Sequence, residues 1–134
     1  MPIALEIVSP EKLVLSRPVD MVVIPAEEGD MGVLGGHAPM IVALRGGAIA
    51  LYTGEEIGDR LFVSGGFAEI TPERCTVLAN DAVPVSALRR AEGERLLVEA
   101  EAAYAAADTS DPAVEDVLLE RIQAARAMVE TAEA

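Results

Sequence analysis

The sequence predicts a β-sandwich or flattened antiparallel barrel over residues 1–84, followed by an antiparallel α-helical hairpin over residues 85–134. The first observation is the spacing of turns. Before Pro84, short Val- and Ile-rich runs alternate with Gly- and Pro-containing turns at intervals of roughly 8–12 residues, which is typical of sandwiches and barrels. The second is periodicity. After Pro84 the chain has one glycine, one proline and fourteen alanines, and its apolar residues recur about every 3.6 positions, as in amphipathic helices.

The first half contains eight apolar runs of strand length, separated by turn residues such as Ser9-Pro10-Glu11, Arg17-Pro18 and Thr71-Pro72-Glu73. Because a short Gly-rich connection between two such runs is typical of a hairpin, Arg45-Gly46-Gly47 predicts a hairpin between the runs on either side of it. No amphipathic helix interrupts the series, so we expect one antiparallel sandwich. The runs are Ile3–Ile7, Leu13–Leu15, Val19–Ile24, Met40–Leu44, Ala48–Tyr52, Leu61–Val63, Phe67–Ile70 and Cys75–Leu78.

The second half predicts two helices joined by a short loop, residues 108–112. Asp111 is suited to cap the second helix with Pro112 in its first position, and Ser86 is suited to cap the first. A loop this short makes the helices antiparallel, so their apolar faces meet. Those faces consist largely of alanines, which bury little area, so the hairpin is predicted to be held weakly and to be able to open. They comprise Leu96, Ala100, Ala103, Tyr104 and Ala107, and Val114, Leu118, Ile122, Ala125, Val129 and Ala132.

Two adjacent cations, Arg89 and Arg90, are placed in the first turn of the first predicted helix, where positive charge opposes the helix dipole. One interpretation is that Glu92 and Glu94 neutralise them, since Arg90 and Glu94 have the i,i+4 spacing of a helical ion pair. The other is that they face an anion or an acidic partner. The sequence leaves both open.

Composition restricts the classes of partner. A formal net charge of −13 argues against direct binding to nucleic acid or to anionic lipid, both of which require a basic surface. Cys75 is the only cysteine, so we expect no internal disulfide and no thiolate metal cluster; its strand-like surroundings predict a buried, inert thiol. A targeting segment and an 18-residue apolar run are both absent, so we expect a soluble protein that stays where it is made and does not insert into lipid.

The segment from residue 27 to residue 39 contains four glycines and ends near the only histidine, His37. A phosphate cradle would also need a cation and a helix start, and this segment is flanked instead by Glu27, Glu28 and Asp30. It predicts an irregular connection that presents backbone to another macromolecule. His37 is either a half-buried residue satisfied by backbone or part of an interface. Without a second histidine or a nucleophile motif, we expect no metal, no cofactor and no catalysis.

Several ordered blocks of the sequence together resemble the epsilon subunit of F-type ATP synthases, and the resemblance covers nearly the whole chain. Ala26 and Gly35 depart from the family pattern, which usually has Gly and Pro there; neither should disturb the fold, although Gly35 makes the loop less rigid. The blocks are Glu6-Ile7-Val8-Ser9-Pro10-Glu11, Ile24 to Leu34, Gly36-His37-Ala38-Pro39-Met40, Leu44-Arg45-Gly46-Gly47, Val63 to Glu69 and Thr76-Val77-Leu78-Ala79.

The resemblance implies a non-catalytic subunit of the central stalk, linking the gamma subunit to the c-ring and helping to couple proton translocation to ATP synthesis. By position, Glu28, Gly29, Asp30 and Met31 are similar to the segment that meets the c-ring, and Ser9 and His37 to residues that face gamma. The location implied is the cytoplasmic face of a bacterial plasma membrane, as a peripheral protein. A hypothesis of a different class is a free-standing sandwich adaptor, or a module for a small ligand, that dimerises through its helices.

The resemblance also bears on two further properties, nucleotide binding and inhibition of ATP hydrolysis. Some relatives bind ATP through an Ile/Leu-Asp-x-x-Arg-Ala motif; residues 85–90 retain an aliphatic residue and Arg89 but lack the Asp and the Ala, which predicts weak or no binding. In many bacterial relatives the hairpin extends along gamma, and basic residues on its second helix contact the alpha–beta head. Here that segment carries only Arg121 and Arg126 against six acidic residues, so we expect transient contact and only weak inhibition of ATP hydrolysis.

Overall fold

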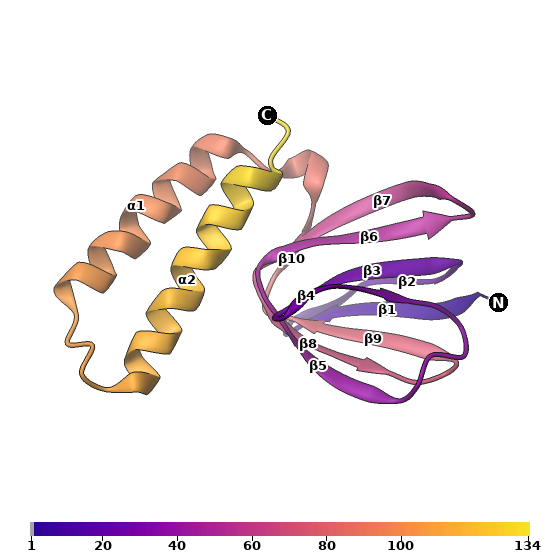
Figure 1. Cartoon of the computed structure of the whole chain (residues 1–134). Helices are drawn as coiled ribbons and strands as arrows, with labels where there is room; N and C mark the ends of the chain where they lie inside the picture. Colours follow the sequence, from indigo (N-terminus) through magenta and orange to yellow (C-terminus); the bar gives the residue numbers. More distant parts are fainter. Residues whose placement is uncertain (1) are drawn as a thin grey trace.

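A computed structural model describes residues 2–134 and contains ten strands and two α-helices within that range (Figure 1). The strands are β1 Ile3–Ser9, β2 Lys12–Val19, β3 Met21–Ala26, β4 Gly29–Val33, β5 Met40–Leu44, β6 Gly47–Thr53, β7 Glu56–Val63, β8 Gly66–Ile70, β9 Arg74–Ala79 and β10 Ala82–Pro84. A 3₁₀ turn, Val85–Ala87, leads to α1 Arg90–Ala106 and α2 Pro112–Thr131. This confirms the predicted fold class of a flattened, nearly closed barrel followed by a helical hairpin.

The strands form one continuous sheet in the order β10-β7-β6-β3-β5-β8-β9-β1-β2, with β4 paired to β3. All pairs are antiparallel except β1 with β9, which run parallel. In β1, β6, β8 and β9 burial alternates along the strand, as the period of two requires, and the inward residues help to fill a core without Trp or Tyr. In β1, for example, Ile3, Leu5 and Ile7 are all 1 % exposed or less.

Three local predictions in the first half are wrong. Strands β5 and β6 do not form a hairpin: β5 pairs with β3 and β8, and β6 with β3 and β7, so residues 45 and 46 carry the chain across the sandwich. Pro18 does not end a strand, because β2 lies at the edge of the sheet, where a missing N–H is tolerated. Residues 29–33 are not an irregular connection; they form β4, which pairs with β3 in a tight hairpin.

The N-cap predicted for α2 is confirmed, and the N-cap predicted for α1 is wrong. The Asp111 carboxylate accepts from the Ala113 N–H at 2.9 Å, with Pro112 in the first turn. Ser86, by contrast, lies in the 3₁₀ turn, and α1 begins only at Arg90 without a side-chain cap. Both donor groups of Arg90 reach the end of α2: its N–H donates to the Ala134 carbonyl at 2.7 Å and its guanidinium to the Ala132 carbonyl at 3.3 Å. A cation at a helix C-terminus is favourable.

The helical hairpin lies against one end of the sandwich (Figure 1). Small residues lie where its helices meet: Ala100 and Ala125 are buried, and Gly93 lies directly against Val129. The Tyr104 hydroxyl donates to Glu115 at 2.8 Å across the loop end. On α1 it is Arg95, not Arg90, that forms ion pairs, with Glu92 and Glu99. In the described part of the chain, neither helix combines the length and apolar character needed to cross a bilayer.

The buried thiol of Cys75 predicts a specific loss of stability at high pH. Cys75 is fully buried in β9, and desolvation raises the pKa of its thiol from 9.0 to about 11. The unfolded chain therefore ionises first, so the free energy of unfolding falls as pH rises from 9 through 11, by about 2.7 kcal/mol at most. Urea unfolding at about pH 8 and about pH 10.5 measures the loss, and Cys75→Ala should show a smaller one. An identical pH dependence in both proteins would contradict the assignment.

Candidate functional site

The acidic turn, residues 27–30, joins β3 to β4 at one end of the sandwich. Ala26 pairs with Gly29, which leaves Glu27 and Glu28 at the tip, and Gly29 has a φ of 141° that favours glycine. The Glu27 N–H donates to the Ala43 carbonyl at 3.0 Å, so the tip is attached to β5. Glu27, Glu28 and Asp30 are exposed, whereas Met31 packs against the core. Of the four residues predicted as a contact segment, Glu28, Gly29 and Asp30 are therefore accessible and Met31 is only partly so.

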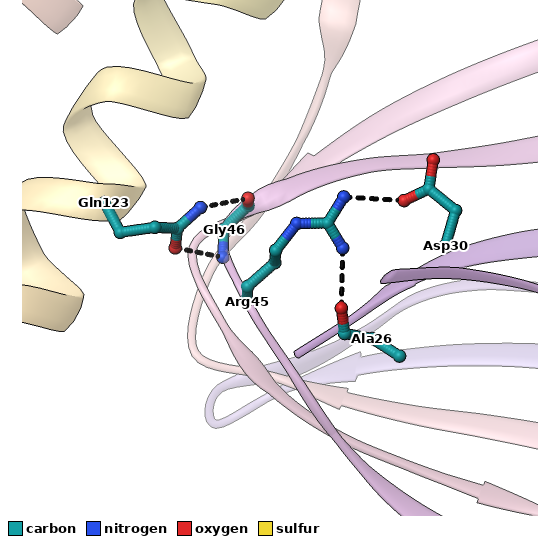
Figure 2. Close-up of polar contacts among 5 residues, drawn as sticks. All are labelled: Ala26, Asp30, Arg45, Gly46 and Gln123. Atoms are coloured by element: carbon teal, nitrogen blue, oxygen red, sulfur yellow. Dashed lines mark hydrogen bonds and ion pairs between the residues drawn. The ribbon is translucent and has the colours of Figure 1, made fainter. Parts of the chain in front are cut away.

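Arg45 holds the acidic turn from the neighbouring crossover (Figure 2). Its guanidinium donates to the Ala26 carbonyl at 2.6 Å and to the Asp30 carboxylate at 2.7 Å. The Asp30 charge is thus already paired within the molecule. Within residues 2–134, no ion pair reaches Glu27 or Glu28. The charges available to a basic partner are therefore those of Glu27 and Glu28.

The structure does not bring Ser9 and His37 together. Register places Ser9 at the end of the sheet that holds Leu78, Gly66 and the acidic turn, whereas His37 precedes β5 at the opposite end. The Ser9 hydroxyl donates to the Lys12 carbonyl at 3.3 Å. His37 is half-buried, and its Nδ1 lies 2.8 Å from the Ala38 carbonyl. The two residues can contact one partner only if that partner spans the sheet between them.

An apolar outer face lies between these two residues. Register aligns Ala43, Phe67, Leu78, Val8 and Leu13 in one row across β5, β8, β9, β1 and β2, with Ile41 one step further along β5. Ile41, Phe67, Leu78 and Leu13 are 52 % to 70 % exposed. Exposed apolar residues that gather on one face are typical of a protein interface. Sequence reasoning missed this face. Phe67 and Leu78 carry a signal for it, since each is a large apolar residue that alternates with the buried residues of its own strand and must therefore point outward.

The remaining sequence candidate, Arg89, is exposed and stands in extended backbone just before α1. It does not line the cleft between α2 and the sandwich, where Asp81, Glu120 and Arg121 are the charged residues. In residues 2–134 no group of three His, Cys, Asp or Glu side chains is arranged to hold a metal ion. The most developed functional features are therefore surfaces, namely the acidic turn and the apolar outer face.

Known proteins match this chain along nearly its whole length. A family model described as "ATP synthase, Delta/Epsilon chain, beta-sandwich domain" matches residues 2–85. The chain is 64 % identical over 129 residues to an ATP synthase epsilon chain of Granulibacter bethesdensis, covering 96 % of both chains, and 46 % identical over 132 residues to that of Gluconacetobacter diazotrophicus, covering 98 % and 94 %.

Two solved structures share its fold. One is a chain of the Euglena gracilis mitochondrial ATP synthase "OSCP/F1/c-ring" structure, with a TM-score of 0.74 and 25 % identity over 95 % of this chain and 79 % of the other. The second is a chain of the Tetrahymena thermophila mitochondrial ATP synthase "central stalk/cring" structure, with a TM-score of 0.69, 12 % identity and coverage of 97 % and 96 %. By the family model and by identity across nearly its whole length, the chain belongs to the epsilon-subunit family of F-type ATP synthases.

Proposed function

We propose that the chain is a non-catalytic part of the central stalk that links the gamma subunit to the c-ring and helps to couple proton translocation to ATP synthesis. It would act as a peripheral protein at the cytoplasmic face of a bacterial plasma membrane. The observation that carries the proposal is the presence of two different interaction surfaces on one sandwich. A charged turn and an apolar face can contact two partners at once, and a hydrogen-bonded sheet between them resists deformation.

The acidic turn is proposed as the c-ring contact. Glu28 is the residue best placed to meet a basic group on a c-ring loop, since Asp30 is held by Arg45. Exposed complementary charges of this kind contribute more to register and to the rate of association than to affinity. The contact would therefore place the stalk correctly on the ring without fixing it through a large buried area.

The apolar outer face is proposed as the gamma contact, bounded by Ser9 at one end of the sheet and His37 at the other. Phe67 and Leu78 pair with each other in neighbouring strands near the middle of this row, and they are 56 % and 52 % exposed. Desolvated aromatic and aliphatic side chains near the centre of an interface usually carry most of its binding energy. Ser9 and His37 would then contribute polar contacts at the margin.

A cross-linking experiment tests the c-ring contact. A cysteine at Glu28, carrying a photoreactive label, should cross-link to a c subunit in the assembled enzyme, because it leaves the Arg45–Asp30 pair intact. Glu55 provides the matched control: it is also an exposed glutamate in a hairpin turn, but it lies at the opposite end of the sandwich, next to the start of β3. Native Cys75 is buried and should not react. Equal labelling of the c subunit from both positions would contradict the proposal.

Contact with the alpha–beta head through α2 is proposed to be transient and weakly inhibitory. Only Arg121 and Arg126 on α2 can pair with acidic head segments, and their spacing of five residues places them apart around the helix. A screened surface ion pair contributes at most about 1 kcal/mol, and the surrounding carboxylates oppose it. Nucleotide contact by Arg89 is likewise proposed to be weak or absent, since Arg89 lies outside the cleft beside α2.

Deleting residues 108–134 tests the strength of inhibition. ATP hydrolysis by the assembled enzyme should rise by less than about fivefold, the equivalent of about 1 kcal/mol. A full-length Arg121→Gln, Arg126→Gln variant is the matched control, because it removes the cations and retains the helix. A rise of about tenfold or more on deletion would show that the helix inhibits strongly.

A further inference from the structure

The side chain of Gln123 connects α2 to the crossover of the sandwich. Its carboxamide NH₂ donates to the Gly46 carbonyl at 2.7 Å, and its Oε1 accepts from the Gly46 N–H at 2.8 Å (Figure 2). One side chain thus satisfies both backbone groups of a residue that pairs with no strand. Since both bonds depend on the same planar amide, they form together only when α2 lies at this height beside the sheet.

Gly46 allows this close approach because it has no side chain. A Cβ at position 46 would lie 2.7 Å from the Cα of Ala124 and 3.0 Å from its Cβ, so any other residue would push α2 away. The backbone at Gly46 does not have a positive φ. The glycine is therefore needed for contact with the helix rather than for a turn.

The residue next to Gly46 is the one that holds the acidic turn. The Arg45 N–H donates to the Pro25 carbonyl at 2.9 Å, and its guanidinium reaches the Ala26 carbonyl and Asp30. Three hydrogen bonds thus attach Arg45 to the end of β3 and to the turn that follows. Residues 45 and 46 are joined by one planar peptide group, so a displacement of Gly46 also displaces the backbone of Arg45.

We propose that Arg45 is the positioning residue of the acidic turn and that α2 fixes it in place through Gln123. The turn is then held most firmly while the helical hairpin lies against the sandwich, since the Glu27 N–H bond to the Ala43 carbonyl and the β3–β4 pairing remain without it. This inference rests on the proposed function of the turn: the position of the hairpin then regulates how the subunit meets a basic partner. An undocked hairpin loosens the turn and frees the Asp30 carboxylate from Arg45.

Amide hydrogen exchange on the isolated full chain tests the coupling. Gly46→Ala and Gln123→Leu should both speed exchange at the amides of residues 27–30 several-fold, together with the amide of residue 46, which reports loss of its hydrogen bond to Gln123. Gly58→Ala is the matched control for the glycine, since a Cβ there meets no atom closer than 3.6 Å. It should leave both regions unchanged.

Two substitutions of Arg45 establish the direction of the coupling. Arg45→Met should speed exchange in the acidic turn while the Gly46 amide stays protected by Gln123. Arg45→Lys should protect the turn only in part, because one ammonium group cannot reproduce the fork that reaches two acceptors. Slow exchange in the turn of a variant whose residue 46 amide exchanges fast would overturn the proposal.

These measurements need no other subunit. A chain that passes them but fails to cross-link to a c subunit through position 28 would contradict the proposed function alone. A chain that cross-links but shows no coupling between residue 46 and residues 27–30 would contradict this inference alone.

Discussion

Gly66→Ala should destabilise the sandwich more than a Gly→Ala substitution at any other glycine of this chain. Gly66 has a φ of 136°, and a Cβ there would lie 2.1 Å from the Leu78 carbonyl oxygen and 3.0 Å from the Ala79 Cα. Backbone strain and overpacking together should cost about 3–5 kcal/mol. Because a domain's total stability is about 5–15 kcal/mol, we expect a large fall in the midpoint of urea unfolding, or no soluble protein.

Gly29→Ala separates strain from overpacking. Gly29 has a similar φ of 141°, but no atom lies within 4 Å of the position that a Cβ would occupy there. The substitution should therefore cost only about 1–2 kcal/mol, the strain alone. Equal losses of unfolding free energy in the two variants would show that the close contact between β8 and β9 is not the reason why position 66 requires glycine.

Phe67→Asp should prevent stable assembly with gamma while the isolated chain stays folded. Phe67 is 56 % exposed on the apolar outer face, so aspartate there should cost about 1 kcal/mol or less in unfolding free energy. At the centre of an interface the same change should cost at least about 2 kcal/mol, or roughly 30-fold in Kd. Titration of labelled variant into an F1 subcomplex that lacks this chain measures that loss.

Ile57→Asp is the matched control for the apolar outer face. Ile57 is 50 % exposed and also lies in a strand, but it belongs to β7, which is not among the strands of that face. Its substitution should leave the affinity for the F1 subcomplex within about twofold, as for surface changes away from an interface. If Ile57→Asp weakens binding as much as Phe67→Asp does, the assignment of the gamma contact to the apolar outer face is wrong.

The sequence predicts the elements of this fold more reliably than their partners. Hydrophobic periodicity identifies both helices and eight of the ten strands within residues 2–134, because burial depends on which residues alternate along the chain; β4 and the short β10 are not among the predicted runs. Gly46 shows why pairing is harder to predict. A glycine pair flanked by apolar runs is typical of a hairpin, yet at Gly46 the glycine accommodates α2, from far along the chain. Local sequence does not distinguish a need for positive φ from a need for space.

The candidate surfaces likewise include features that the sequence predicts and features that only the fold reveals. The exposed carboxylates of the acidic turn were evident from residue type and from the neighbouring glycines. The pairing of Asp30 with Arg45 was not, because the crossover that brings residue 45 beside the turn depends on the topology of the sheet. The apolar outer face likewise becomes visible only when the register of five strands is known, since each strand contributes only one or two residues to it.

The parallel pairing of β1 with β9 affects how the protein is made. Ala4 lies beside Arg74 and Val8 beside Leu78, so β1 gains its second neighbour only after nearly the whole of the following sandwich has been synthesised. Until then, one edge of an apolar strand is open to other chains. The helices, whose contacts are local, can form within microseconds, whereas closure between distant strands belongs to the millisecond-to-second range. Sheet closure should therefore be the slow step of folding, and the period of greatest risk of aggregation during synthesis.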